Sequence, residues 1–172
     1  MRILFYAAAL IVAAAAMAAD TPAPTGTPDL DRLAPFAGTW RSDAENFDTP
    51  YSKAGKVSSM LVNQCWKVGA FFVCNQSVNG ASRVLLVFSY KGGDTYWVSY
   101  VPADTGHAAS GTVVVSGGVW TYPGQHTSLG QVTYFRTVDI FNGTDSIDFR
   151  EEYSTDNEHW TAMSQGHESR VR

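Results

Sequence analysis

The side chains that most often form metal sites are sparse in this sequence, and their spacing fits no known metal motif. The histidines are His107, His126, His159 and His167, and none belongs to a His-x-His or His-Glu-x-x-His pattern. His159 and His167 share one face of a predicted strand. Eight residues at about 3.3 Å each separate them too far to bind one ion. We therefore predict no metal site.

Acidic residues gather near the C-terminus, where a buried carboxyl could act as an acid or a base. Strand alternation places Glu151 on the same face as Phe149 and Tyr153. Burial there would raise its pKa, as general acid–base catalysis requires. An ion pair with Arg136 or Arg150 is the commoner outcome for such a residue. The sequence also has no Gly-x-Ser-x-Gly elbow, no Cys-His nucleophile pair and no phosphate-binding glycine loop, so we predict no catalytic residue.

Aromatic side chains are dense and supply the candidates for ligand binding. Trp97, Trp120 and Trp160 each follow a predicted turn, where they either anchor hairpin ends or surround a ligand mouth. The segment 96–100 carries aromatic residues on both faces. This fits a mixed aromatic and polar interior that binds a small amphipathic molecule, and equally a filled core. The candidate ligand-binding residues are Trp40, Trp66, Trp97, Tyr100, Tyr134, Arg136 and Trp160.

The N-terminus has the pattern of an export signal. Arg2 precedes an apolar run from Ile3 to Ala16, and residues 16–18 (Ala-Met-Ala) fit a small-x-small cleavage site. The run is shorter than the roughly 20 residues of a membrane span. We expect a signal peptide over 1–19, a flexible Thr/Pro/Gly linker over 20–28 and one domain over 29–172. The location would be periplasmic or secreted, without a membrane span.

Charge argues against a nucleic-acid partner. Without Arg2, the chain has 12 − 1 = 11 basic and 16 acidic residues, a formal net charge of −5. The four lysines do not cluster, and nucleic-acid binding requires a basic stripe.

The two cysteines of an exported chain predict a disulfide. Gly69 and Ala70 suit a two-residue type II′ turn between strands, which places Cys65 opposite Cys74. Counting outward from the turn, this pair is non-hydrogen-bonded, with Cα atoms about 4.5 Å apart. Because the closed loop is short, we expect a stabilisation of about 2–3 kcal/mol.

The domain reads as successive short strands with very little helix. Apolar and polar residues alternate between tight turns such as Asn79-Gly80 and Gly117-Gly118. The pattern predicts about ten antiparallel strands after a short helical turn near 30–36, with a strand at 119–122 and a turn at 123–130. Closing this meander into a barrel removes both exposed edges, and a sandwich is the main alternative. An outer-membrane barrel fits poorly, because several strands are shorter than the 9–11 residues needed to cross.

The segment Leu33-x-x-Phe36-x-Gly38-x-Trp40 resembles the Gly-x-Trp signature of lipocalin-like (calycin) barrels. The resemblance implies a barrel whose end is closed by a short helix, with Trp40 plugging the base. Such barrels commonly place a basic residue of the last strand across this tryptophan, and Arg170 has the matching position. The resemblance therefore implies a barrel-closing group of Gly38, Trp40 and Arg170.

The whole domain is similar to a family of uncharacterised, exported, lipocalin-like bacterial proteins. Cys65-Trp66, Cys74 and the late motif Ser154-Thr155-Asp156-Asn157-x-x-Trp160 carry this likeness, with Asn157 where that family usually has glycine. A more distant resemblance is to haem-binding, nitrobindin-like barrels. In those proteins two glycines follow the tryptophan, whereas here Arg41-Ser42-Asp43 follows Trp40. We therefore predict no cofactor, and His167 is the residue to test as a haem ligand.

These observations predict an all-β, lipocalin-like antiparallel barrel of about ten strands with a short N-terminal helical turn. They favour an exported, non-catalytic binding protein for a small, partly hydrophobic molecule. Three alternatives stay open: a haem-binding barrel, a calycin-type enzyme and a protein–protein interaction module.

Overall fold

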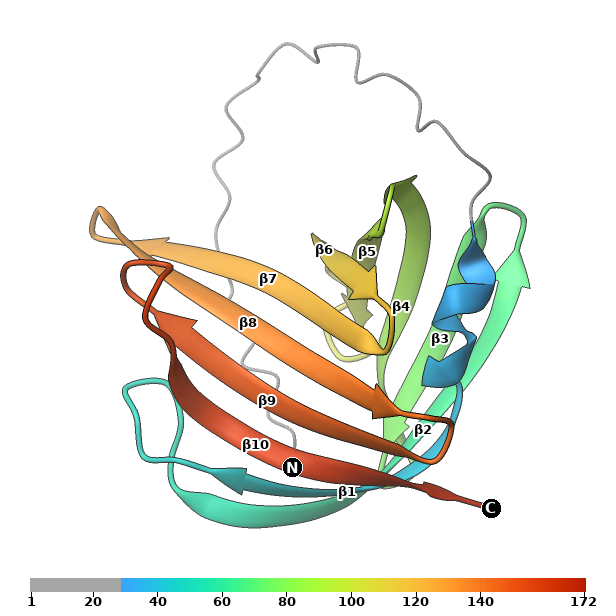
Figure 1. The fold of residues 1–172 in the computed structure, drawn as a ribbon, viewed down its shortest axis with the longest axis horizontal. Helices are drawn as coiled ribbons and strands as arrows, with labels where there is room; N and C mark the ends of the chain where they lie inside the picture. Colours follow the sequence, from blue (N-terminus) through green and yellow to red (C-terminus); the bar gives the residue numbers. More distant parts are fainter. Residues whose placement is uncertain (1–28) are drawn as a thin grey trace, which may run out of the picture.

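The structure is a computed structural model that describes residues 29–172, and these residues form a closed antiparallel barrel of ten strands with one short 3-10 helix (Figure 1). Each strand pairs with its neighbours in sequence, and β1 pairs with β10 to close the ring. The predicted all-β barrel is therefore confirmed, and the sandwich is excluded. The predicted signal peptide (1–19) and linker (20–28) lie outside the described residues. The elements in chain order are η1 (Leu30–Phe36), β1 (Gly38–Asn46), β2 (Gly55–Val68), β3 (Phe71–Val78), β4 (Ala81–Gly92), β5 (Thr95–Pro102), β6 (Ala109–Ser116), β7 (Val119–Ser128), β8 (Gln131–Asn142), β9 (Ser146–Ser154) and β10 (Thr161–Val171).

The turn between β2 and β3 sets the register of the two cysteines. Gly69 has a φ of 57° and Ala70 is outside the positive-φ region, as a type II′ turn requires. Cys65 then lies opposite Cys74, and the two are joined as a disulfide with their Cα atoms 4.1 Å apart. The predicted pairing and register are those of the structure.

The strand β7 is longer than the sequence pattern predicted. We expected a strand over 119–122 and a turn over 123–130, but the strand continues to Ser128 and the turn is only Leu129-Gly130, both at positive φ. Pro123 is tolerated inside the strand because no hydrogen bond is donated from this position. Thr121 pairs with Val114 of β6. Along β7, the next backbone nitrogen that faces β6 is that of Pro123, and proline has no N–H to donate.

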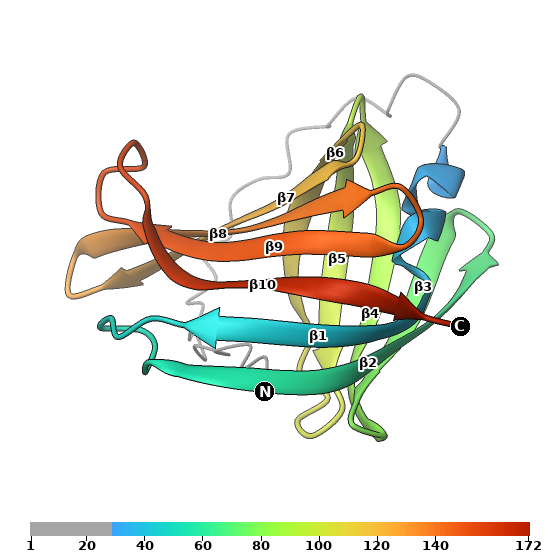
Figure 2. The same ribbon diagram turned by 60° about the horizontal axis from the view of Figure 1, so that its bottom comes forward.

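The ladder between β6 and β7 therefore ends early. It holds three residue pairs, whereas β7 and β8 form ten. Beyond Thr121, the β7–β8 hairpin diverges from β6. Figure 2 shows the consequence: β8 to β10 with β1 and β2 run across the view, while β3 to β6 stand steeply behind them. We call the unpaired stretch between 109–113 and 122–128 the lateral seam.

Alternation along each strand determines which side chains face the interior. Trp40, Leu61, Phe88 and Trp120 point inward and are almost fully buried. The helix η1 adds Leu30, Leu33 and Phe36 to the buried cluster that contains Phe88 and Trp120. The core thus fills the end of the barrel beside η1. No helix among the described residues is long and apolar enough to cross a membrane.

Candidate functional site

The end of the barrel beside η1 is sealed by Trp40 and Arg170. The guanidinium carbon of Arg170 lies 4.0 Å from the centre of the Trp40 ring. Its Nη1 donates to the carbonyl of Ala37 at 2.8 Å, and its Nη2 donates to that of Pro35 at 3.1 Å. A side chain at Gly38 would occupy the space of this guanidinium, and the φ of 140° at Gly38 also disfavours other residues. The residues predicted to close the barrel are therefore in mutual contact.

Buried polar groups attach η1 to the strands around it. Asn63 donates from Nδ2 to the carbonyl of Phe36 at 3.0 Å, and Gln76 donates to the Asn63 side-chain oxygen at 3.0 Å. The Tyr96 hydroxyl donates to the carbonyl of Asp29 at 2.7 Å, and burial raises the pKa of that hydroxyl. Because these buried groups are satisfied only with η1 in place, this end is a structural base.

The inner wall changes character toward the opposite end. There the inward-facing side chains are only half-buried, although they belong to the same strands. Tyr122, Thr137 and Glu151 lie side by side on β7, β8 and β9 in one row of the register. The wall combines aromatic rings with hydroxyl and carboxyl oxygens, a lining that suits an amphipathic molecule. Its half-buried inward-facing members are Tyr100, Tyr122, Phe135, Thr137, Glu151 and Tyr153.

Tyr51, in the loop between β1 and β2, folds over this open end. Its ring lies edge-on to Phe135 and Tyr153, with centroids 5.1 and 4.9 Å away. Its hydroxyl is hydrogen-bonded to that of Thr133 at 3.2 Å. Tyr51 and the lateral seam therefore border the half-buried part of the inner wall, which we call the open half.

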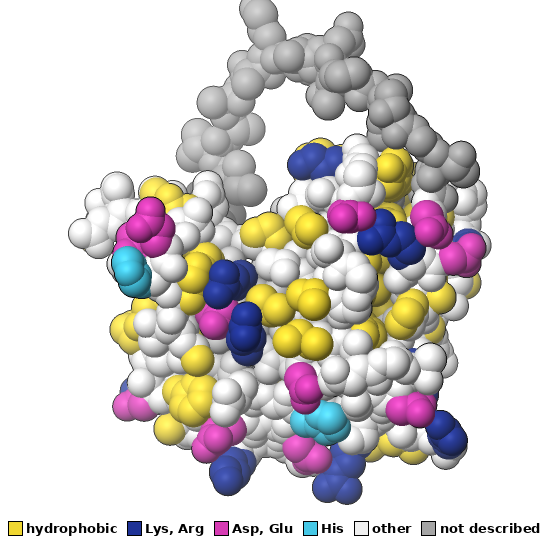
Figure 3. Space-filling view, in the orientation of Figure 1, with side chains coloured by type: hydrophobic (Ala, Val, Ile, Leu, Met, Phe, Trp, Pro, Cys, Tyr) yellow, Lys and Arg dark blue, Asp and Glu magenta, His cyan; other side chains and the backbone are white. Residues whose placement is uncertain are grey.

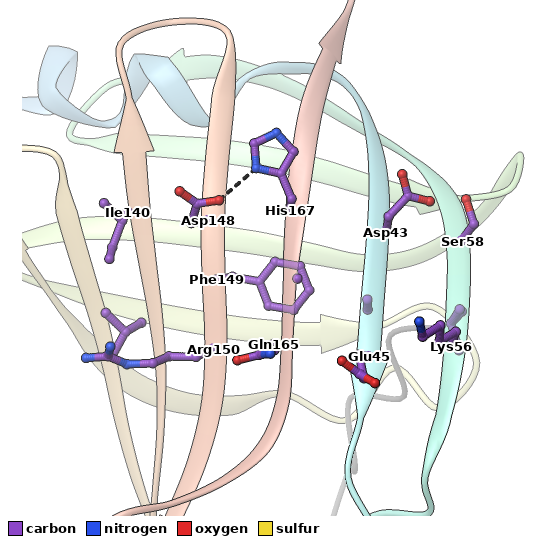
Figure 4. A pocket seen from close by; sticks show the side chains of 14 residues that line it. Asp43, Glu45, Lys56, Ser58, Ile140, Asp148, Phe149, Arg150, Gln165 and His167 are labelled. Atoms are coloured by element: carbon purple, nitrogen blue, oxygen red, sulfur yellow. Dashed lines mark hydrogen bonds and ion pairs between the residues drawn. The ribbon is translucent and has the colours of Figure 1, made fainter.

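A groove of about 730 Å³ crosses the outer face of β8, β9, β10, β1 and β2 (Figure 4). In it, His167 shares a 2.7 Å hydrogen bond between Nδ1 and Asp148 Oδ1, which lowers the pKa of that carboxyl. Ser58 belongs to β2, two strands away from His167, so their backbones are about 10 Å apart and the hydroxyl cannot reach the imidazole. The pair therefore does not activate this serine.

The sequence offered His167 as the residue to test as a haem ligand, but its side chain points outward. It is hydrogen-bonded to Asp148 on the outside of the barrel and does not face the interior. Of the histidines on the described strands, His126 on β7 has the inward parity, opposite Thr133. A haem bound inside the barrel would therefore not use His167.

The candidate ligand-binding residues do not form one site. Trp40 belongs to the sealed base, and Tyr100 lies on the open inner wall. Trp66 and Trp97 point outward and are 46% and 48% exposed, the latter beneath the Lys91 ammonium at 4.1 Å. The idea that tryptophans surround one ligand mouth is wrong for Trp97. Strand parity explains this, because Trp97 alternates with the inward-facing Tyr96 and Val98.

The other three candidates meet on the outer face of β8 and the loop after β9. Tyr134, Arg136 and Trp160 border a second groove of about 460 Å³. Sequence reasoning did not select Tyr122, Phe135 or Thr137 as lining residues. Alternation along β7 and β8, starting from the buried Trp120, would have placed these side chains on the inner face. The turn predicted at 123–130 broke that alternation, so they were not found.

Charged side chains of both signs are interspersed with hydrophobic ones on the face in Figure 3, without a stripe of one sign. This face therefore carries no basic stripe of the kind that binds a nucleic-acid backbone.

Comparison with known proteins shows the fold alone. No protein-family model and no curated protein matches the sequence. The structure is similar to that of Rv2717c from M. tuberculosis, with a TM-score of 0.53 and 15% identity over 85% of this chain and 99% of that one. It is also similar to a protein of unknown function from the DUF3598 family of Nostoc punctiforme, with a TM-score of 0.53 and 16% identity over 81% of this chain and 49% of that one. This chain thus spans about half of the second protein.

Proposed function

We propose that this protein is an exported, non-catalytic binding protein that holds a small, partly hydrophobic molecule in the open half of the barrel. The observation that carries the proposal is the contrast along the inner wall. Inward-facing residues such as Phe88 and Trp120 are buried near η1, whereas Tyr122 and Tyr153 on the same wall remain half-exposed. A half-buried inner surface that combines aromatic rings with polar oxygens is the usual lining of a ligand cavity.

The lining supports a ligand with an apolar body and hydrogen-bond donors. Tyr100, Tyr122 and Phe135 offer ring surface, and Thr137 and Glu151 offer oxygen acceptors. The lateral seam supports entry from the side, since β6 and β7 share only three residue pairs. Export is supported by the Cys65–Cys74 disulfide and by the signal-like sequence at 1–19.

A filling substitution tests the proposal. Thr137→Trp places a large ring between Tyr122 and Glu151, and Thr112→Trp is the matched control on the outer face of β6, beside Trp97. The probe is N-phenyl-1-naphthylamine, a neutral dye that fluoresces when it leaves water. We expect saturable one-to-one binding that is lost in Thr137→Trp and kept in Thr112→Trp.

Equal binding by the two variants, or none by the parent, would contradict the proposal. Far-ultraviolet circular dichroism and a urea midpoint show whether each variant is folded. If Thr137→Trp does not fold, Tyr122→Ala enlarges the same cavity and must change the affinity for the dye.

The haem and enzyme alternatives have separate tests. A haem titration should give no sharp one-to-one Soret band. A band lost on changing His126 would support the haem alternative, because His126 is the inward-facing histidine of the described strands. Hydrolytic activity lost in His167→Gln would support the enzyme alternative through the Asp148 pair.

A further inference from the structure

We infer that the outer face of β7 and β8 carries a second binding site, for an oligosaccharide, centred on Trp160 and Arg136. The site lies outside the barrel cavity and does not depend on the function proposed above. It occupies the groove of about 460 Å³ between β7, β8 and the loop that joins β9 to β10.

The centre of the site is the Arg136 side chain, which lies over the Trp160 ring and pairs with Glu152. The Arg136 guanidinium carbon lies 4.0 Å from the centre of the Trp160 ring. Its Nε donates to Glu152 at 2.6 Å, and the Glu152 side chain is only 12% exposed. Among the described residues, no acceptor is hydrogen-bonded to Nη1 or Nη2 of Arg136. The guanidinium is therefore held flat with two donor groups left for a ligand.

Arg136 shares its carboxylate partner with a second arginine. Glu152 Oε2 lies 2.6 Å from Nε of Arg136 and 3.4 Å from Nε of Arg150. The Arg136 guanidinium is therefore held by an ion pair within the protein, while its remaining donors lie beside an aromatic ring. This arrangement suits a ligand with many hydroxyl acceptors.

The loop before Trp160 is organised to hold that ring in place. The Asp156 carboxylate accepts from the backbone N–H groups of Glu158 and His159 at 2.9 and 2.8 Å. These hydrogen bonds hold the pKa of Asp156 far below its usual range, and the one from the His159 backbone has the largest effect. Asn157 has a φ of 64°, the left-handed conformation expected for the glycine that usually stands at this position of the motif. The motif thus fixes a short turn whose end presents Trp160 against Arg136.

A sugar ring matches this surface better than other small ligands. A hexose has one face of C–H groups, which packs on an aromatic ring, and an edge of hydroxyls, which bond to planar polar side chains. Here Trp160 and Tyr134 supply rings, and Gln125 and Asn157 supply amide groups beside the Arg136 donors. Because the groove is an open trough on the surface, it suits a chain of sugars rather than a single enclosed one.

Isothermal titration calorimetry with chitohexaose, cellohexaose and a hexamer of galacturonate tests the inference. We expect at least one of these oligomers to bind, with about tenfold or greater loss of affinity in Trp160→Ala. Trp97→Ala is the matched control, because Trp97 also lies under a cation, Lys91, yet borders neither groove. It should bind the sugar as the parent does.

Two results would overturn the inference: no binding of any of the three oligomers, or equal loss in Trp97→Ala. Folding of each variant is checked by its urea midpoint, and Arg136→Lys, which keeps the charge but loses the planar fork, should also weaken binding. Thr137→Trp separates the two sites, since it should block the dye and leave sugar binding unchanged.

Discussion

The two ends of this barrel are built from the same ten strands, yet one is packed solid and the other is open. At one end, η1 inserts Leu33 and Phe36 among the inward-facing residues, and Arg170 covers Trp40. At the other end, the Tyr51 ring lies against Phe135 and Tyr153, and the β6–β7 ladder stops before Pro123. Strand pairing alone therefore does not decide whether a barrel is filled. Filling depends on the helix η1 at one end and on the missing backbone donor of Pro123 at the other.

The largest expected difference between the ends concerns stability. Replacing the fully buried Trp40 by Ala should lower the free energy of unfolding by roughly 3–5 kcal/mol, as for other buried aromatic residues. Tyr153→Ala, at the half-exposed open end, should cost clearly less. Urea unfolding of both variants measures this. Equal losses would remove the distinction between a structural base and a binding half.

A smaller effect should follow from Arg170, which lies over Trp40. Arg170→Lys keeps the charge but loses the planar stack and the two carbonyl contacts, so we expect a loss of about 0.5–2 kcal/mol. Arg172→Lys, whose guanidinium pairs with Asp145 in solvent, should change stability very little. If both variants unfold at the same urea concentration as the parent, Arg170 does not close the barrel.

The smallest effect is local and depends on pH. The pKa of Asp156 is lowered in the folded state, so its ionised form stabilises the loop above the unfolded pKa of about 3.9. This contribution is lost as the pH falls through the lower folded value. The protection factor of the His159 amide, which is its intrinsic exchange rate divided by the observed rate, should therefore fall in acid in the parent, because its N–H bonds to Asp156. Asp156→Asn should show fast exchange already at neutral pH, and a matching profile in both proteins would contradict this role.

Most of the fold was predictable because its signals are local. Glycine and asparagine turns, the Gly38-x-Trp40 signature and the facing cysteines each act within a few residues. The extent of β7 was not predictable, because whether Pro123 ends a strand depends on which neighbour its nitrogen would have faced. That error also hid the inner wall. The meeting of Arg136 with Trp160 depends on a contact between a strand and a later loop, which residue spacing does not reveal.

The central claim, that the open half holds a small molecule, is tested most directly by native mass spectrometry of the protein purified without denaturation from the cells that make it. The account predicts an added small-molecule mass on the parent and on Thr112→Trp, and a bare mass for Thr137→Trp. A bare parent chain, or an added mass that persists in folded Thr137→Trp, would contradict it.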